Sequence, residues 1–104
     1  MSAQNGTRVL VAEKIGESGV ELLREHFDVD VRTSWDGGEL AQAIGDYDGI
    51  LIRSASKLTG DVLANAGRLK AIGRAGVGVD NVDVDAATKR GIIVANAPQS
   101  NVVT

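Results

Sequence analysis

The chain of 104 residues contains no cysteine, one proline and one histidine, and aromatic residues make up only 3% of it. The absence of cysteine excludes disulfides and thiolate metal sites and fits a reducing compartment, so we expect a cytoplasmic protein. The few aromatic residues and the net charge of −3 argue against affinity for nucleic acid. No apolar run approaches the roughly 18 residues of a membrane span. We therefore expect a soluble single domain that binds neither nucleic acid nor membrane.

Short apolar runs alternate along the chain with segments of helical periodicity. Five short segments rich in Val, Ile or Leu predict strands at residues 9–12, 29–31, 49–52, 69–73 and 92–94, of which 29–31 alternates between Val and Asp. The last helical segment begins at Asp83 and carries Lys89 and Arg90 in its final turn, the charge order that a helix dipole favours. Strands alternating with helices indicate right-handed crossovers and a parallel sheet. The predicted fold is α/β, a doubly wound, flavodoxin-like, five-stranded parallel sheet with strand order 2-1-3-4-5.

Polar and glycine-rich residues follow the central strands. The third strand is followed by Arg53, Ser54 and Ser56, and the fourth by the turn from Arg74 to Gly78. In open parallel sheets, ligands bind beyond the carboxyl ends of the strands, where these segments are expected to meet. Arginine offers a planar fork of donors to carboxylates and phosphates, and glycine lets backbone N–H groups approach a ligand. The pattern predicts an anion-binding edge, with solvated surface arginines as the alternative.

Other patterns are incomplete. The turn from Gly76 to Asn81 begins like a dinucleotide fingerprint, but Asn81 stands where the third glycine is expected. Asp83 and Asp85 are better explained by helix capping than by a calcium loop, because the closing Glu is missing. His26 has no neighbouring Ser or Asp that suggests a triad. The residues alone therefore predict no metal site, general base or nucleophile.

Four segments taken together resemble the amino-terminal part of the D-2-hydroxyacid dehydrogenases. The likeness runs from about residue 9 to the last residue and is strongest to the branch of the family that oxidises 3-phosphoglycerate. The segments are Ile52-Arg-Ser-Ala55, Gly73-Arg-Ala-Gly-Val-Gly-Val-Asp-Asn-Val-Asp83, Ala86-Ala-Thr-Lys-Arg-Gly91 and Asn96-Ala-Pro-Gln-Ser-Asn101.

The resemblance implies an oxidoreductase that uses NAD to convert 3-phosphoglycerate to 3-phosphohydroxypyruvate, the first step of serine biosynthesis, and that forms a homo-oligomer. It implies that Val77 also approaches the nicotinamide end of NAD. The residues it implies as substrate contacts are Arg53, Ser54, Ser56, Arg74, Asn101 and the backbone of Val77 and Gly78.

The resemblance also divides the chain. Residues 1–7 would be a disordered polar tail, residues 8–100 the substrate-binding domain, and residues 101–104 the start of a hinge to an NAD-binding domain. That second domain, with the family's catalytic Arg, Glu and His, has no counterpart in these 104 residues, and neither has a further helix that completes the substrate domain. We therefore expect a truncated chain that is inactive alone and exposes apolar surface.

Three alternatives stay open. The substrate could be another 2-hydroxy acid, and the sequence does not distinguish NAD from NADP. A flavodoxin-like receiver or binding module is a second alternative, although Arg53 stands where a receiver carries its acceptor Asp, and Asp46 and Asp48 lie at the opposite end of the third strand. The third is a domain with no function of its own that self-associates through its exposed apolar surface.

Overall fold

The computed structural model describes residues 7–35, 38–53, 56–75 and 81–97. Five strands alternate with four α-helices, and a short 3-10 helix, η1, follows the second of them. In chain order the elements are β1 (Arg8–Val11), α1 (Glu17–Arg24), β2 (Asp28–Val31), α2 (Glu39–Ala43), η1 (Ile44–Asp46), β3 (Gly49–Ile52), α3 (Gly60–Leu63), β4 (Ala71–Ala75), α4 (Val84–Lys89) and β5 (Ile93–Ala97).

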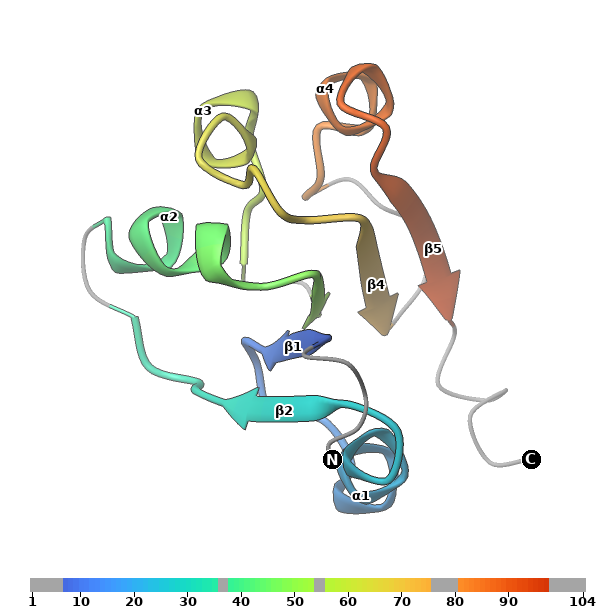
Figure 1. Ribbon diagram of the computed structural model, residues 1–104. Helices are drawn as coiled ribbons and strands as arrows, with labels where there is room; N and C mark the ends of the chain where they lie inside the picture. Colours follow the sequence, from blue (N-terminus) through green and yellow to red (C-terminus); the bar gives the residue numbers. More distant parts are fainter. Residues whose placement is uncertain (1–6, 36–37, 54–55, 76–80, 98–104) are drawn as a thin grey trace.

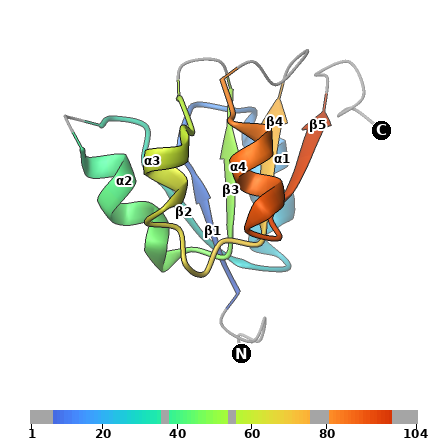
Figure 2. The ribbon, with the colours of Figure 1, turned by 90° about the horizontal axis from the view of Figure 1, so that it is seen from above.

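All five strands join one parallel sheet in the order β2-β1-β3-β4-β5. Their arrowheads point the same way, with α2, α3 and α4 in front of the sheet and α1 behind it (Figure 2). After β2 the chain crosses back over β1 to add β3 on its other side, and this reversal in the order of strand addition places helices on opposite faces of the sheet. The predicted fold class and strand order are confirmed.

The core lies between the sheet and the layer of α2, α3 and α4 (Figure 1). Strand side chains alternate between the two faces, so Ile50 and Ile52 are buried in this layer while Leu51 faces the other way and is only half-buried. Leu63 and Ala87 enter from α3 and α4, and both are fully buried. Each fully buried Leu or Ile contributes about 1.5–3 kcal/mol of transfer free energy. This layer therefore fixes the strand ends that carry the candidate site.

The opposite face of the sheet is less covered. Among the described helices, α1 alone lies on it, beside β1 and β2 (Figure 1). An apolar hollow of about 380 Å³ lies over β3, β4 and β5, and Ile93 at its side is 69% exposed. Its walls include Val9, Leu23, Phe27, Leu51, Ala71 and Ala95. Exposed apolar surface was expected from the resemblance, and this hollow provides it.

Several helix ends follow the sequence signals. Thr59 Oγ1 accepts the Val62 N–H at 3.3 Å and Asp83 Oδ1 accepts the Ala86 N–H at 3.0 Å, so Thr59 caps α3 and Asp83 caps α4. Gly91 has a φ of 76°, the left-handed conformation that often ends a helix. Asp83 therefore caps α4, as the sequence predicted.

The fourth strand differs from its prediction. It runs from Ala71 to Ala75 rather than over residues 69–73, because pairing with β3 begins at Gly49 opposite Ala71. Leu69 is buried in the core from the preceding turn, where its N–H donates to the Ala66 carbonyl. Arg74 is therefore a strand residue, paired between Ile52 and Asn96, and not the first residue of a loop.

Some expectations fall outside the described residues. These are the tail at residues 1–6, the hinge at 101–104, and the site residues Ser54, Val77, Gly78 and Asn101. In the described parts of the chain, no helix has the length and apolar character needed to cross a membrane. The same parts contain no group of three or more His, Cys, Asp or Glu residues that could hold a metal ion.

Candidate functional site

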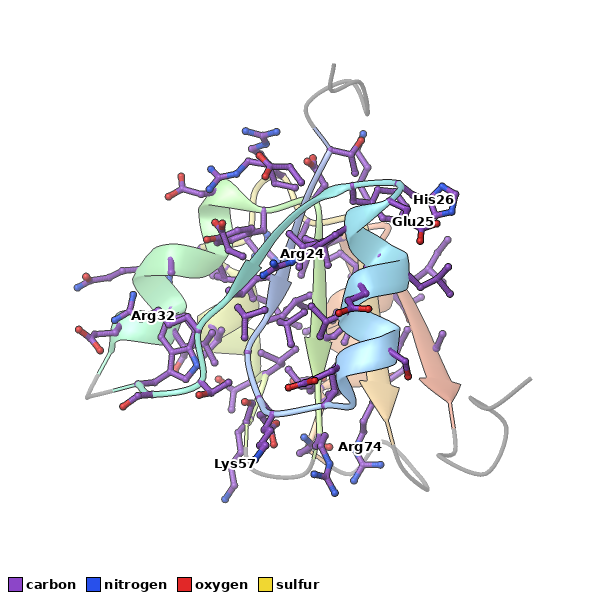
Figure 3. All side chains as sticks on the ribbon, turned by 90° about the horizontal axis from the view of Figure 1, so that it is seen from below. Arg24, Glu25, His26, Arg32, Lys57 and Arg74 are labelled. Atoms are coloured by element: carbon purple, nitrogen blue, oxygen red, sulfur yellow. The ribbon has the colours of Figure 1, made fainter. Side chains whose placement is uncertain are left out.

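The described candidate residues Arg53, Ser56 and Arg74 lie at the carboxyl edge of the sheet. Arg53 directly follows β3, and Arg74 is the fourth of the five residues of the neighbouring β4. Figure 3 labels Arg74 and Lys57 at the edge to which the arrowheads of β4 and β5 point. Because β3 and β4 are adjacent and parallel, the positions of Arg53 and Arg74 come together as the sequence predicts.

Glu13, which comes two residues after β1, closes the loop after β3. Its Oε2 accepts the backbone N–H of Arg53 at 2.7 Å and that of Ser56 at 2.9 Å. The two bonds span 40 and 43 residues of sequence. One carboxylate oxygen therefore holds both ends of the segment at residues 53–56 against the end of β1.

Asn81 holds the same loop from the other side. Its Nδ2 donates to the backbone carbonyls of Arg53 at 2.6 Å and Ser56 at 2.5 Å, and its Oδ1 accepts from Arg74 Nε at 2.6 Å. The side-chain amide thus uses both kinds of group, donor and acceptor, within the protein. Asn81 links the loop after β3 to the arginine on β4.

The two arginines differ in exposure. The Arg53 side chain is exposed, and its Nη1 donates to the Lys14 carbonyl at 3.4 Å. Arg74 is 9% exposed. The Asn81 amide orients the Arg74 guanidinium by accepting its Nε–H. The edge therefore combines the exposed guanidinium of Arg53 with the buried guanidinium of Arg74, which Asn81 orients.

Ser56 is 8% exposed, and both its backbone groups are used to hold the loop. A short parallel bridge between Leu58 and Val82 continues the same contact, with the Leu58 N–H donating to the Asn81 carbonyl at 2.8 Å. A hollow of about 440 Å³ opens beside this bridge, with Lys57 and Thr59 among its walls. The segment behind the edge is thus fixed by backbone pairing.

Neither Glu13 nor Asn81 was predicted from the sequence to hold the site, and Asn81 was noticed only because it stands where a glycine was expected. Most of their partners are backbone groups, which every residue has, so the sequence gives no sign of these contacts. One signal was available for Glu13, since it is the first polar residue after a buried strand at the edge where ligands bind.

The fold and the carboxyl edge of the sheet define an α/β domain. The carboxyl ends of its neighbouring strands β3 and β4 bring two arginines together. Residues 9–104 match the family described as D-isomer specific 2-hydroxyacid dehydrogenase, catalytic domain, and the chain belongs to this family. The resemblance drawn from the sequence is confirmed, and the receiver alternative is replaced by this assignment.

Individual relatives agree with the family. The chain is 50% identical over 97 residues to D-3-phosphoglycerate dehydrogenase 2, chloroplastic, of Arabidopsis thaliana, covering 92% of this chain and 16% of that protein. A crystal structure of a Pyrococcus horikoshii protein matches with a TM-score of 0.85 and 38% identity, covering 90% of this chain and 28% of that one. The NAD⁺-bound 3-phosphoglycerate dehydrogenase of Entamoeba histolytica matches with a TM-score of 0.75 and 27% identity, covering 88% and 32%. The chain thus spans a sixth to a third of the relatives it matches.

Proposed function

We propose that this chain is the substrate-binding part of an NAD-dependent D-3-phosphoglycerate dehydrogenase. The enzyme would oxidise 3-phosphoglycerate to 3-phosphohydroxypyruvate and so begin serine biosynthesis. One observation carries the proposal: Arg53 and Arg74 are joined through Asn81 at the carboxyl edge of the sheet. The 50% identity to a relative of that name supports the same activity.

The chemistry of the substrate fits this edge. 3-Phosphoglycerate carries a carboxylate and a phosphate, and a guanidinium fork matches the oxygens of either group. Arg53 is exposed and can reach a ligand, while Arg74 adds fixed positive charge beside it. Ser54, Ser56, Asn101 and the backbone of Val77 and Gly78 would complete the contacts, as the family resemblance implies.

The contribution of this chain to the reaction is orientation and charge neutralisation. Bound NAD would supply the acceptor for the hydride from C2 of the substrate, and a base would take the 2-hydroxyl proton. The described donor groups suit the substrate's anions better than a dinucleotide, because the Asn81 amide is already engaged by Arg53, Ser56 and Arg74. We assign only Val77 to the nicotinamide end of NAD, and we expect the 104-residue chain to have no dehydrogenase activity alone.

Calorimetric titration of the chain with 3-phosphoglycerate at low ionic strength tests the proposal. We expect weak binding that falls further with added salt, because salt screens exposed charges. Arg53→Ala should weaken it by about tenfold, the equivalent of one charge-assisted contact. Arg24→Ala removes the same charge from an exposed position on α1 and should leave the affinity unchanged. No binding by the unmodified chain would contradict the proposal.

D-glycerate distinguishes the phosphorylated substrate from a plain 2-hydroxy acid. It keeps the carboxylate and the 2-hydroxyl but lacks the phosphate, so it should bind more weakly than 3-phosphoglycerate. Equal affinities for the two would favour another 2-hydroxyacid dehydrogenase of the same family.

A further inference from the structure

Asn81 is the residue that ties the two arginines of the edge to each other. Arg53 contributes its backbone carbonyl to this link and Arg74 contributes its Nε–H, at 2.6 Å in both cases. The pairing of β3 with β4 brings the two positions together. The side-chain amide of Asn81 then links them.

The chemistry of this link requires an amide in one orientation. Two carbonyl oxygens, of Arg53 and Ser56, need a donor, and Arg74 Nε–H needs an acceptor. An aspartate could accept from Arg74 but would direct its second oxygen at two carbonyl oxygens. An alanine could do neither. The described contacts therefore account for asparagine at this position.

The backbone under Asn81 is itself fixed. The Asn81 carbonyl accepts the Leu58 N–H, and the Asp83 N–H donates to the Leu58 carbonyl, both at 2.8 Å. Leu58 is fully buried and Asp83 caps α4. A side chain on such a support holds its orientation with little loss of entropy when a ligand arrives.

We propose that Asn81 is a positioning residue that sets Arg53 and Arg74 at one spacing, matched to a substrate with two anionic groups. This inference rests on the proposed function and adds to it a residue that need not touch the substrate. It explains why the position that departs from the dinucleotide fingerprint carries an amide. The same amide that positions the arginines takes the place of the third glycine, which a dinucleotide site uses for close packing of the helix on the strand.

The first test is affinity. Asn81→Ala should weaken binding of 3-phosphoglycerate by about tenfold. In the Arg53→Ala background the same change should have a much smaller effect, because Asn81 acts through Arg53 and Arg74. Asn65→Ala is the matched control, since Asn65 Nδ2 donates to the Asp61 carbonyl within α3 and the turn that follows it, away from the edge. Equal losses from Asn81→Ala in both backgrounds would overturn the inference.

The second test observes the link without a ligand. The Nε–H resonance of Arg74 should shift and exchange faster with water in Asn81→Ala, and stay protected in Asn81→Asp, which keeps an acceptor. An unchanged resonance in Asn81→Ala would overturn the inference. If Asn81→Ala does not fold, loss of protection at Arg74 in Asn81→Asp would overturn it instead. If the unmodified chain fails to bind 3-phosphoglycerate, the proposed function fails and takes the substrate role of Asn81 with it. If the chain binds but Asn81→Ala binds equally well, the inference alone fails.

Discussion

The amino ends of the strands and the carboxyl ends of β3 and β4 use the same residue types in different ways. Near the amino ends of the strands, arginines pair with carboxylates: Arg8 with Asp30 at 2.9 Å and Arg68 with Asp48 at 3.2 Å. At the carboxyl edge, the carboxylate of Glu13 accepts backbone N–H groups and the acceptor beside Arg74 is the amide of Asn81. The ion pairs join side chains of opposite charge, whereas the Asn81 amide orients the Arg74 guanidinium by a hydrogen bond to its Nε–H. The first arrangement serves stability and the second suits a binding edge.

Tyr47 completes the group at the amino ends. Its hydroxyl donates to Asp30 at 2.6 Å, and the Arg8 guanidinium lies 4.7 Å from the ring centroid. The Tyr47 hydrogen bond, and then Arg8, hold the pKa of the Asp30 carboxyl below its usual value against the opposing effect of burial. Burial, followed by the hydrogen bond to Asp30, raises the pKa of Tyr47 to about 12. These groups interact with one another and should respond to mutation through stability.

The largest loss of stability is expected from Asp48→Ala. Asp48 Oδ2 accepts the backbone N–H of Arg8 at 2.9 Å and pairs with Arg68, and its side chain is 17% exposed. Removing it leaves the Arg8 N–H without this acceptor and should cost about 2 kcal/mol of unfolding free energy in urea titrations. Asp48→Asn keeps an acceptor and should cost less. The exposed Asp46→Ala is the control, at within about 0.5 kcal/mol, and an Asp48→Ala loss no larger than this would contradict the account.

Tyr47→Phe should have a smaller effect. It removes the hydroxyl bound to Asp30 but keeps the ring, which is 9% exposed and packs in the core. The expected loss is about 1 kcal/mol at pH 7, measured in the same way. A stability equal to that of the unmodified chain would mean that this hydrogen bond contributes nothing.

The unmodified chain and Tyr47→Phe can also be compared as the pH is raised. The folded state holds the Tyr47 proton up to a pKa of about 12, whereas the unfolded chain releases it near pH 10. The stabilisation is therefore fully present below pH 10 and is lost as the pH rises towards 12. Between pH 9 and pH 11 the unmodified chain should lose about 1 kcal/mol more than Tyr47→Phe. Parallel pH profiles for the two proteins would show that Tyr47 titrates normally.

The smallest change in stability is expected at the other end of the sheet. The Arg53 side chain is exposed, and its long contact to the Lys14 carbonyl is weak, so Arg53→Ala should alter unfolding by no more than about 0.5 kcal/mol. The same variant should lose about tenfold in affinity for 3-phosphoglycerate. A large loss of stability would place Arg53 with the residues at the amino ends.

The sequence predicted the fold well because β1 and β3, at the centre of the strand order, are short apolar runs. Residues 49–52 form β3 as expected, and the caps at Thr59 and Asp83 carry local signals. The position of β4 was displaced because Leu69 is as apolar as a strand residue but is buried from a turn. Hydrophobicity reports burial, whereas strand limits depend on pairing with a neighbour.

The candidate site was predicted only in part. The meeting of Arg53 and Arg74 follows from strand order, which the periodicity supplies. The roles of Glu13 and Asn81 depend on contacts with backbone groups 25 to 43 residues away, and no local pattern encodes them. Arg74 was expected in a loop, but its pairing within β4 gives it a more rigid base.

The contrast between the two ends of the sheet can be measured in one experiment. A ¹⁵N-labelled chain titrated with 3-phosphoglycerate at low salt should show amide shifts at Arg53, Ser56, Arg74 and Asn81, with Arg8, Asp30 and Tyr47 unchanged. Shifts concentrated at the amino ends of the strands, or no shifts at either end, would contradict the assignment of the carboxyl edge as the binding surface.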